Sequence, residues 1–257
     1  MSQRVPILVY HHVYPEGHEE LTAPSGERAT GIIGAAALRR QLDYLVAEGW
    51  EVISTTRLVD WLERGVSIPQ RAVVLHFDNG WLDTYTVAWP ILREYGLTAT
   101  CYLISALAAA TEGEPVAVST STEGAVAKPG LSWQQAAELI ADGWEMGAHT
   151  ATHPRLAEVY ATVGDGGVVA EIERSHAMYR EALDAVPAHF AYPSGSRNAQ
   201  TDALLAPYYR SLRRWHFTSP PRWTYTDRST SPLALECQNI DNTVSFGDFV
   251  RLFEGAG

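Results

Sequence analysis

Two histidines spaced four residues apart carry the sharpest chemical signal in the chain. His149 and His153 stand in the segment HTATHP, directly after a short run at 144–148 that predicts a strand. Imidazoles at this spacing can face the same way on a turn of helix, and neutral imidazole suits zinc or a similar divalent ion. Two solvated histidines on a loop would give the same pattern. The position after a strand and before Pro154 favours the metal interpretation.

Asp78 and Asn79 form a second candidate group. They follow the apolar run at 72–77, and Gly80 behind them lets the backbone turn sharply. Asp78 can act as a general base that activates water, and Asn79 can offer its amide oxygen to a metal. An ordinary Asp-Asn-Gly turn is the alternative interpretation.

A third candidate is the segment FAYPSG at 190–195. A strand that ends in Pro-Ser-Gly can aim a backbone N–H into a pocket, as an oxyanion hole requires, although a plain loop has the same composition. Further along, arginines and tryptophans alternate over 210–223. We interpret this stretch as a solvated helix face beside two core tryptophans, with binding of a phosphate group or a sugar face as the alternative.

The motifs at 78–79, 149 and 193–194 all fall just after predicted strands, which indicates how the fold positions them. Apolar runs predict strands at 5–10, 52–53, 72–77, 98–104, 144–148, 189–192, 215–218 and 233–235. Helical periodicity predicts helices at 35–48, 56–64, 82–95, 132–140, 169–183 and 246–253. Residues 11–34 are typical of a long loop, and 106–130 of a surface excursion. Strand and helix alternate without a break in composition, which predicts parallel βα units in one domain, with chemistry at the strand ends.

Composition narrows the possible partners. The 257 residues are 46% apolar and carry a net charge of −11, which excludes a disordered chain and argues against duplex nucleic acid or an anionic membrane as partner. Cys101 and Cys237 are predicted to be free thiols. The opening segment is too short for a signal peptide, and no apolar run reaches the roughly 18 residues of a membrane helix. We therefore expect a cytoplasmic protein, with its oligomeric state left open.

Taken together and in this order, the segments resemble the polysaccharide deacetylases of carbohydrate esterase family 4. The resemblance runs from about Val5 to Ile240 and includes ILVYHHV, VVLHFDNGWLDTY, GWEMGAHTATHP and FAYPSG. YHHV and FAYPSG are most similar to the branch that acts on poly-N-acetylglucosamine. The resemblance implies an α/β fold, a distorted (β/α)7 barrel that fills residues 1–257 as a single domain.

The resemblance also implies roles for particular residues. Asp78 matches the catalytic base, and the Ser194 backbone N–H matches the group that binds the oxyanion. A divalent metal is implied, zinc first and cobalt or nickel as alternatives, with Asn79, His149 and His153 as its ligands. The residues expected to line the substrate pocket are Tyr10, His11, Tyr192 and Pro193.

Three departures from the family pattern bear on activity. Asn79 stands where the family has a second aspartate, which leaves the metal site one negative charge short and can impair activity. The late histidine that serves as general acid is missing from the segment LALECQNID, and His216 is the nearest candidate. Ala191 stands where other branches carry an arginine that steadies the base.

The expected function is metal-dependent removal of the N-acetyl group from an acetamido sugar. A cytoplasmic enzyme would meet a soluble amino sugar or oligosaccharide rather than a cell-wall polymer, so a small-molecule substrate is the expected partner. Two alternatives stay open. One is a metal-independent amidohydrolase acting on a cyclic amide or ureide, and the other is a non-catalytic carbohydrate-binding barrel with a degraded site.

Overall fold

A curled parallel sheet forms the centre of the protein. The computed structural model describes residues 3–22, 31–110, 114–120, 123–215 and 223–257. Within these ranges eight strands pair in parallel, in the order β11-β10-β9-β6-β5-β1-β12, with β4 beside β5. Their bounds are β1 Ile7–Tyr10, β4 Glu51–Val52, β5 Ala72–Asn79, β6 Thr100–Leu103, β9 Glu145–Ala148, β10 His189–Ala191, β11 Ser211–Arg213 and β12 Gln238–Asn239.

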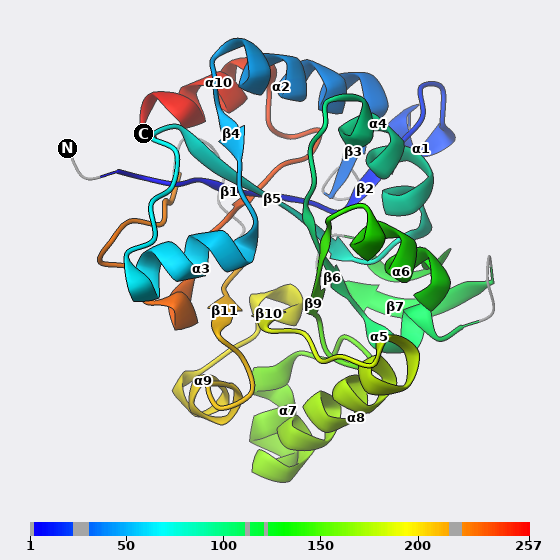
Figure 1. Ribbon diagram of the computed structural model, residues 1–257. Helices are drawn as coiled ribbons and strands as arrows, with labels where there is room; N and C mark the ends of the chain where they lie inside the picture. The colour runs from blue at the N-terminus through cyan, green and yellow to red at the C-terminus, as the bar shows by residue number, and fades with distance from the viewer. Residues whose placement is uncertain (1–2, 23–30, 111–113, 121–122, 216–222) are drawn as a thin grey trace.

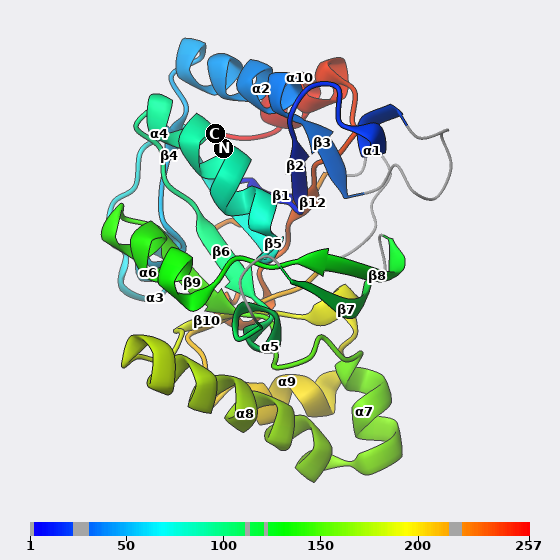
Figure 2. The ribbon, with the colours of Figure 1, turned by 90° about the vertical axis from the view of Figure 1, so that its right-hand side faces the viewer.

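One late segment brings the two edges of this sheet together (Figures 1 and 2). Leu235 forms a parallel bridge with Arg213 in β11, and its N–H donates to the Leu212 carbonyl at 3.0 Å. The chain then enters β12, where Gln238 pairs with Leu8 of β1. This arrangement confirms the predicted fold class, a distorted (β/α) barrel.

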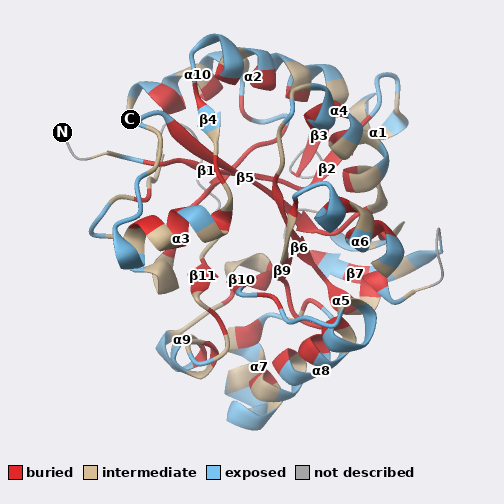
Figure 3. Cartoon of the chain, viewed as in Figure 1, coloured by how far each residue is buried: buried red, intermediate tan, exposed pale blue. Residues whose placement is uncertain are grey.

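Helices cover the outside of the sheet and supply the apolar core. The longer ones are α2 Ala35–Ala47, α3 Thr55–Arg64, α6 Trp133–Ala141, α7 Leu156–Val163, α8 Asp165–Leu183, α9 Ala199–Leu205 and α10 Phe246–Glu254, with the shorter α4 at Trp89–Glu94. Leu38, Leu42 and Leu45 show the pattern, because their helical spacing puts all three on the buried face of α2. Each such side chain contributes about 1.5–3 kcal/mol on burial. Figure 3 shows the buried residues along the strands and on the inner sides of the helices.

Several connecting elements differ from those predicted from the sequence. The predicted loop at 11–34 contains β2 His12–Tyr14, α1 Glu19–Thr22 and β3 Ile32–Gly34, and β2 pairs with β3 in parallel. The excursion at 106–130 contains most of α5 Ser105–Ala108 and an antiparallel hairpin, β7 Pro115–Thr120 and β8 Gly124–Pro129. The predicted helix at 82–95 is π-helical over Thr84–Ala88, and α7 and α9 were not predicted. The strand predicted at 233–235 is largely a short 3₁₀ turn, and 216–218 lie outside the described residues.

The interior of the barrel is polar near the carboxyl ends of the strands, and beneath this layer lies an apolar cluster that includes Ile7, Val9 and Val74. Side chains alternate along each strand, so the partners of Asp78 across the sheet mark one inward row. Asp78 pairs with Tyr102 of β6, and Gly147 of β9 pairs with Tyr102 on its other side. A Cβ on Gly147 would lie 2.4 Å from the Tyr102 ring, so glycine there makes room for the ring to lie across the barrel. The inward row therefore ends in polar side chains that can take part in catalysis, at the carboxyl edge of the sheet.

The helices of the described part include none long and apolar enough to cross a bilayer. The two cysteines are both buried and free, as predicted.

Candidate active site

A narrow cavity lies at the carboxyl ends of β1, β5, β9 and β10, where the predicted site residues meet. It is lined by His11, Asp78, Asn79, Thr120, His149, His153, Tyr192, Ser194 and Trp215. Seven of these nine were predicted from the sequence. Segments distant in the chain therefore converge at one mouth of the barrel, where parallel sheets of this kind hold their active sites.

The two imidazoles lie against each other, with ring centroids 4.8 Å apart and ring planes at 60°. The predicted turn of helix is wrong, because Thr150 and His153 both have left-handed backbone conformations, with φ of 67° and 63°. The His149 Nδ1 lies 2.8 Å from the Ala191 carbonyl oxygen, and the His153 Nδ1 lies 2.8 Å from the Ser119 carbonyl oxygen. A carbonyl only accepts hydrogen bonds, so each Nδ1 carries the proton and each Nε2 keeps its lone pair.

Both rings are neutral at physiological pH. Burial lowers the pKa of His149 to about 3 and the pKa of His153 to about 4, because a charged imidazole loses hydration there. The neutral ring is the form that binds a metal ion. The pair is therefore in the correct protonation state and tautomer to supply two nitrogen ligands.

Asn79 completes the donor set that the sequence predicted. It is 2% exposed and has a left-handed backbone with φ of 74°, and within the described chain its buried Oδ1 has no hydrogen-bond partner. A buried amide oxygen without a partner is costly, and a cation would satisfy it. Two imidazole nitrogens and this oxygen fit a divalent ion. The described residues include no cluster of three or more His, Cys, Asp or Glu side chains suited to a metal, since the third donor here is an amide.

Asp78 is held by an arginine that the sequence analysis misplaced. Arg213 Nη2 lies 2.7 Å from Oδ1 and 2.5 Å from Oδ2 of Asp78, and the two side chains are 0% and 3% exposed. Arg213 lies in β11 and faces into the barrel, so the prediction of a solvated helix face is wrong here. Its register partner in β10 is Ala191, the position where the family arginine was expected. Arg213 thus takes that place from the neighbouring strand.

This pair keeps Asp78 ionised. Burial acts to raise the pKa of Asp78, but the Arg213 charge and its hydrogen bonds outweigh burial and hold the pKa well below its ordinary value. The Arg213 guanidinium also lies over the Tyr102 ring, 5.0 Å from its centroid, and donates to the Cys237 sulfur at 3.3 Å. The carboxylate at the site is therefore charged and fixed in orientation.

His11 faces Asp78 across the cavity, whereas its neighbour Tyr10 does not reach it. The His11 Nε2 lies 3.9 Å from the Asp78 Oδ2, and its buried Nδ1 has no hydrogen-bond partner among the described residues. Burial lowers the pKa of His11. Tyr10 points into the core, where its hydroxyl donates to Gln41 at 2.8 Å and its ring stacks on Phe77. This corrects the substrate-binding role expected for Tyr10, and His216 lies outside the described residues.

The turn after β10 brings the third predicted segment to the cavity. Tyr192 and Ser194 line it, and Pro193 opens the short 3₁₀ turn at Pro193–Gly195 without lining the cavity. Ser194 has a left-handed backbone with φ of 53°. A Cβ on Gly195 would lie 2.1 Å from the Trp215 carbonyl oxygen, so only glycine fits there. This close approach fixes the turn against the chain that follows β11.

Two residues that line the cavity were not predicted to belong to the site. Trp215 was assigned to the core, and Thr120 belonged to the presumed excursion. Thr120 reaches the cavity because the β7–β8 hairpin folds back beside it, a long-range arrangement that no local pattern signals.

A wider cleft of about 440 Å³ adjoins the cavity. The two share Thr120, His153 and Ser194. The rest of the cleft runs along α7, and its lining includes Arg155 before the helix, Glu158 within it and Thr162 near its end. The site therefore opens on one side into a groove lined by both charged and apolar side chains.

Solved structures share this fold over the whole chain. A deacetylase from Streptococcus pyogenes, PplD, in complex with acetate, has a TM-score of 0.79 at 23% identity, and the match covers 98% of this chain and 99% of that one. IcaB from Ammonifex degensii has a TM-score of 0.76 at 22% identity, covering 98% of this chain and 97% of that one. These likenesses show a common fold.

Sequence comparisons point to the same group of proteins. The poly-beta-1,6-N-acetyl-D-glucosamine N-deacetylase of Escherichia coli is 33% identical over 63 residues, which are 24% of this chain and 9% of that protein. The Bacillus subtilis protein YxkH is 25% identical over 101 residues, 39% of this chain and 32% of that protein. The chain thus spans a third or less of these curated relatives. The polysaccharide deacetylase family model matches residues 65–208, more than half of the chain, which therefore belongs to the polysaccharide deacetylase family.

Proposed function

We propose that this deacetylase is metal-dependent and removes the N-acetyl group from acetamido sugars within a soluble oligosaccharide. The observation that carries the proposal is the donor set in the cavity. Two neutral imidazoles, each fixed through Nδ1 by a carbonyl, lie with the unpartnered Asn79 oxygen beside an ionised Asp78. A cytoplasmic location remains part of this proposal.

The residues that would hold the ion are His149 and His153 through Nε2 and Asn79 through Oδ1. When bound, a divalent metal supplies Lewis acidity, which polarises the acetamide carbonyl and stabilises the charge that develops on its oxygen. Zinc suits two nitrogens and one oxygen, and cobalt or nickel can take the same ligands. An amide in place of a carboxylate leaves the donor set neutral, so we expect weaker binding than an aspartate would give.

Asp78 takes a proton from the attacking water in this proposal. The water oxygen bonds to the acetamide carbon, the carbon–nitrogen bond breaks, and the products are acetate and a free amine. Arg213 keeps Asp78 ionised and oriented, so the carboxylate is ready to accept. The Ser194 N–H, at the turn beside the cavity, is proposed to donate to the tetrahedral oxyanion.

His11 is proposed to return a proton to the leaving nitrogen. A carboxylate with a low pKa holds a proton only briefly, and His11 lies 3.9 Å away, close enough to receive it after a small movement. The proton taken from water would then reach the amine through His11. Position 216, predicted from the sequence as the acid, lies outside the described residues.

The adjoining cleft supports a substrate longer than one sugar. Its volume of about 440 Å³ lies directly next to the cavity, and it is lined by Arg155 and Glu158, which form an ion pair with each other at 2.6 Å. A single acetamido sugar held at Asp78 would leave this cleft unused. The cleft therefore favours an oligosaccharide over a monosaccharide.

Acetate release tests the whole proposal. N-acetylglucosamine oligomers of increasing length are incubated with zinc, cobalt or nickel and with the wild-type protein, Asp78→Asn, or Asp165→Asn, an exposed control in α8. Asp78→Asn should lower kcat by about 10²–10⁴, while the control keeps the wild-type rate. The value of kcat/KM should rise with chain length.

Other outcomes would redirect the assignment. Full activity after exhaustive chelation would favour the metal-independent amidohydrolase. Sugar binding without acetate release, with each metal and also in Asn79→Asp, would favour the non-catalytic barrel. Equal kcat/KM for one sugar and for longer oligomers would overturn the oligosaccharide assignment.

A further inference from the structure

The β7–β8 hairpin contacts the site directly. The Ser119 carbonyl in β7 accepts the hydrogen bond from His153 Nδ1 at 2.8 Å, and Thr120 lines both the cavity and the cleft. The orientation of the His153 ring therefore depends on where the hairpin lies. The partner of His149 is Ala191 in the central sheet, so only one of the two imidazoles is held by a peripheral element.

Apolar packing holds this hairpin only lightly. Val118 is buried in a small cluster with Trp81, Ile104 and Leu107, and Val116 and Val126 pack against the cluster. Much of the remaining hairpin surface is exposed or half-buried. A polar anchor must supply part of the attachment.

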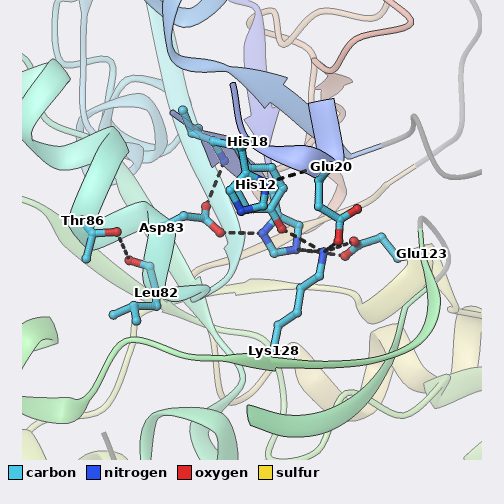
Figure 4. A network of polar contacts seen from close by, with 10 residues as sticks. His12, His18, Glu20, Leu82, Asp83, Thr86, Glu123 and Lys128 are labelled. Carbon is cyan, nitrogen blue, oxygen red and sulfur yellow. Dashed lines mark hydrogen bonds and ion pairs between the residues drawn. The ribbon is translucent and has the colours of Figure 1, made fainter. Parts of the chain in front are cut away.

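That anchor is a buried histidine between two carboxylates (Figure 4). His12 Nε2 lies 2.9 Å from the Glu123 Oε2 at the hairpin, and His12 Nδ1 lies 2.6 Å from the Asp83 Oδ2. Asp83 is fixed in turn, because its Oδ1 accepts from the Val13 N–H at 2.9 Å. Lys128 in β8 donates to Glu123 and, at 2.9 Å, to the Tyr14 hydroxyl. The His12 side chain is 1% exposed and that of Glu123 is 8% exposed.

Both ring nitrogens of His12 face carboxylates, which accept hydrogen bonds and cannot donate when ionised. The ring satisfies both contacts only as the imidazolium. Burial works against that charge, but Asp83 and Glu123 more than offset it and raise the pKa of His12. Burial alone would raise the pKa of Glu123, whereas His12 and Lys128 lower it to about 2.

Other charged groups near the ring do not reverse this balance. The Lys128 Nζ lies 3.5 Å from Nε2, and Glu20 lies 3.6 Å from that ammonium. On the other side, the neighbouring His11 is neutral because its pKa is lowered. The rings of Trp81 and Tyr14 stack on His12 at 4.8 Å and 5.1 Å, and His18 stacks on Tyr14.

We propose that His12 is a protonation-dependent latch that holds the β7–β8 hairpin, and through the Ser119 carbonyl the His153 ring, in place at the site. His12 is a positioning residue, since it acts through the hairpin. A raised histidine pKa stabilises the folded contact below the ordinary pKa of 6.5, and the contact is lost as pH rises through the raised value. The hairpin therefore loosens on the alkaline side. The consequence for metal binding rests on the proposed function, whereas the latch itself does not.

Hydrogen exchange of residues 114–129 tests the latch without any activity assay. Protection factors, corrected for intrinsic exchange, are measured at pH 6.5 and pH 9 for the metal-free wild type, Glu123→Gln and Glu114→Gln. Glu114 is an exposed glutamate next to β7, so it controls for the same substitution outside the latch. Wild type and control should lose at least tenfold protection between the two pH values. Glu123→Gln should already have low protection factors at pH 6.5, similar to those of the wild type at pH 9, and they should change little between the two pH values.

Zinc affinity, measured by competition with a chelating dye, supplies the second readout. Glu123→Gln should bind zinc about tenfold more weakly than wild type at pH 6.5, a typical effect of disturbing the partner of a ligand histidine. The difference should shrink toward alkaline pH as the wild-type latch opens. His12→Gln gives the same result by another route, and thermal unfolding of each variant verifies that it folds.

Wild-type protection of the hairpin that does not change with pH, or equal protection in Glu123→Gln and wild type at pH 6.5, would overturn the latch. Normal exchange results with no acetate release from any sugar would leave the latch standing and refute the proposed function instead.

Discussion

Replacing Arg213 by methionine should destabilise the protein far more than removing a surface arginine. The guanidinium contacts both oxygens of Asp78 at 2.7 Å and 2.5 Å, and neither side chain is open to solvent. For charge centres about 4 Å apart and an effective dielectric constant near 20, the Coulomb energy is about 4 kcal/mol. Removing one partner leaves a buried charge uncompensated, which costs about 3–5 kcal/mol. Methionine fills much of the same volume, so little of this loss is due to packing.

Urea unfolding at pH 7 measures the effect. Arg213→Met should lower the free energy of unfolding by about 3–5 kcal/mol, and adding Asp78→Asn should restore most of it, because no unpaired charge then remains. Arg251→Met is the matched control, since Arg251 is 58% exposed and pairs with Asp248 on the surface. Such a pair contributes about 0–1 kcal/mol.

The pH dependence gives the same reasoning a second check. In the wild type the pKa of Asp78 is lowered, so its contribution to stability is present above the ordinary value of 3.8 and is lost as pH falls below it. Without Arg213, burial raises the pKa of Asp78. As pH falls, protonation of Asp78 therefore removes the unpaired buried charge and raises the free energy of unfolding of the variant. The difference between the two proteins should shrink toward pH 4. A loss under 1 kcal/mol at pH 7, or an unchanged difference at pH 4, would refute this account of the pair.

Three further substitutions probe the rest of the site. Asn79→Asp should raise zinc affinity at least tenfold in a dye-competition titration, because it adds a negative charge to a neutral donor set; unchanged affinity would remove position 79 from the ligands. His11→Gln should lower kcat for acetate release by about 10², with a smaller effect on KM; an unchanged kcat would exclude it as the acid. Gly195→Ala should lower Tm by several degrees, because its Cβ would meet the Trp215 carbonyl, whereas Gly166→Ala, with open space around it, should not.

Much of the barrel could be predicted because its signals are local. Apolar runs followed by polar ends marked the strands at 72–77, 98–104 and 144–148, and they lie within a residue or two of β5, β6 and β9. The resemblance to the family then identified Asp78, Asn79, His149 and His153, which do meet in one cavity. These assignments needed only short windows of sequence.

The role of Arg213 could not be predicted from the local sequence, because strands distant in the chain form its surroundings. The strand β11 has three residues, and the basic stretch around it has the composition of a solvated surface. Its burial follows from register with Ala191 and contact with Asp78, separated from it by 22 and 135 residues. A signal did exist for Tyr10: neighbours on a strand face opposite sides, so a pocket that takes His11 turns Tyr10 away.

Four of the cavity's surrounding residues, Asn79, Thr150, His153 and Ser194, have left-handed backbones although none is glycine. Each such conformation is disfavoured by about 1–2 kcal/mol for an ordinary side chain, somewhat less for asparagine. A screen for higher thermal stability would select glycine at these four positions, because glycine adopts the left-handed conformation without this cost. Glycine at positions 79 and 153 would remove side chains that are proposed to bind the metal, so only positions 150 and 194 can be relaxed in this way without loss of a proposed ligand.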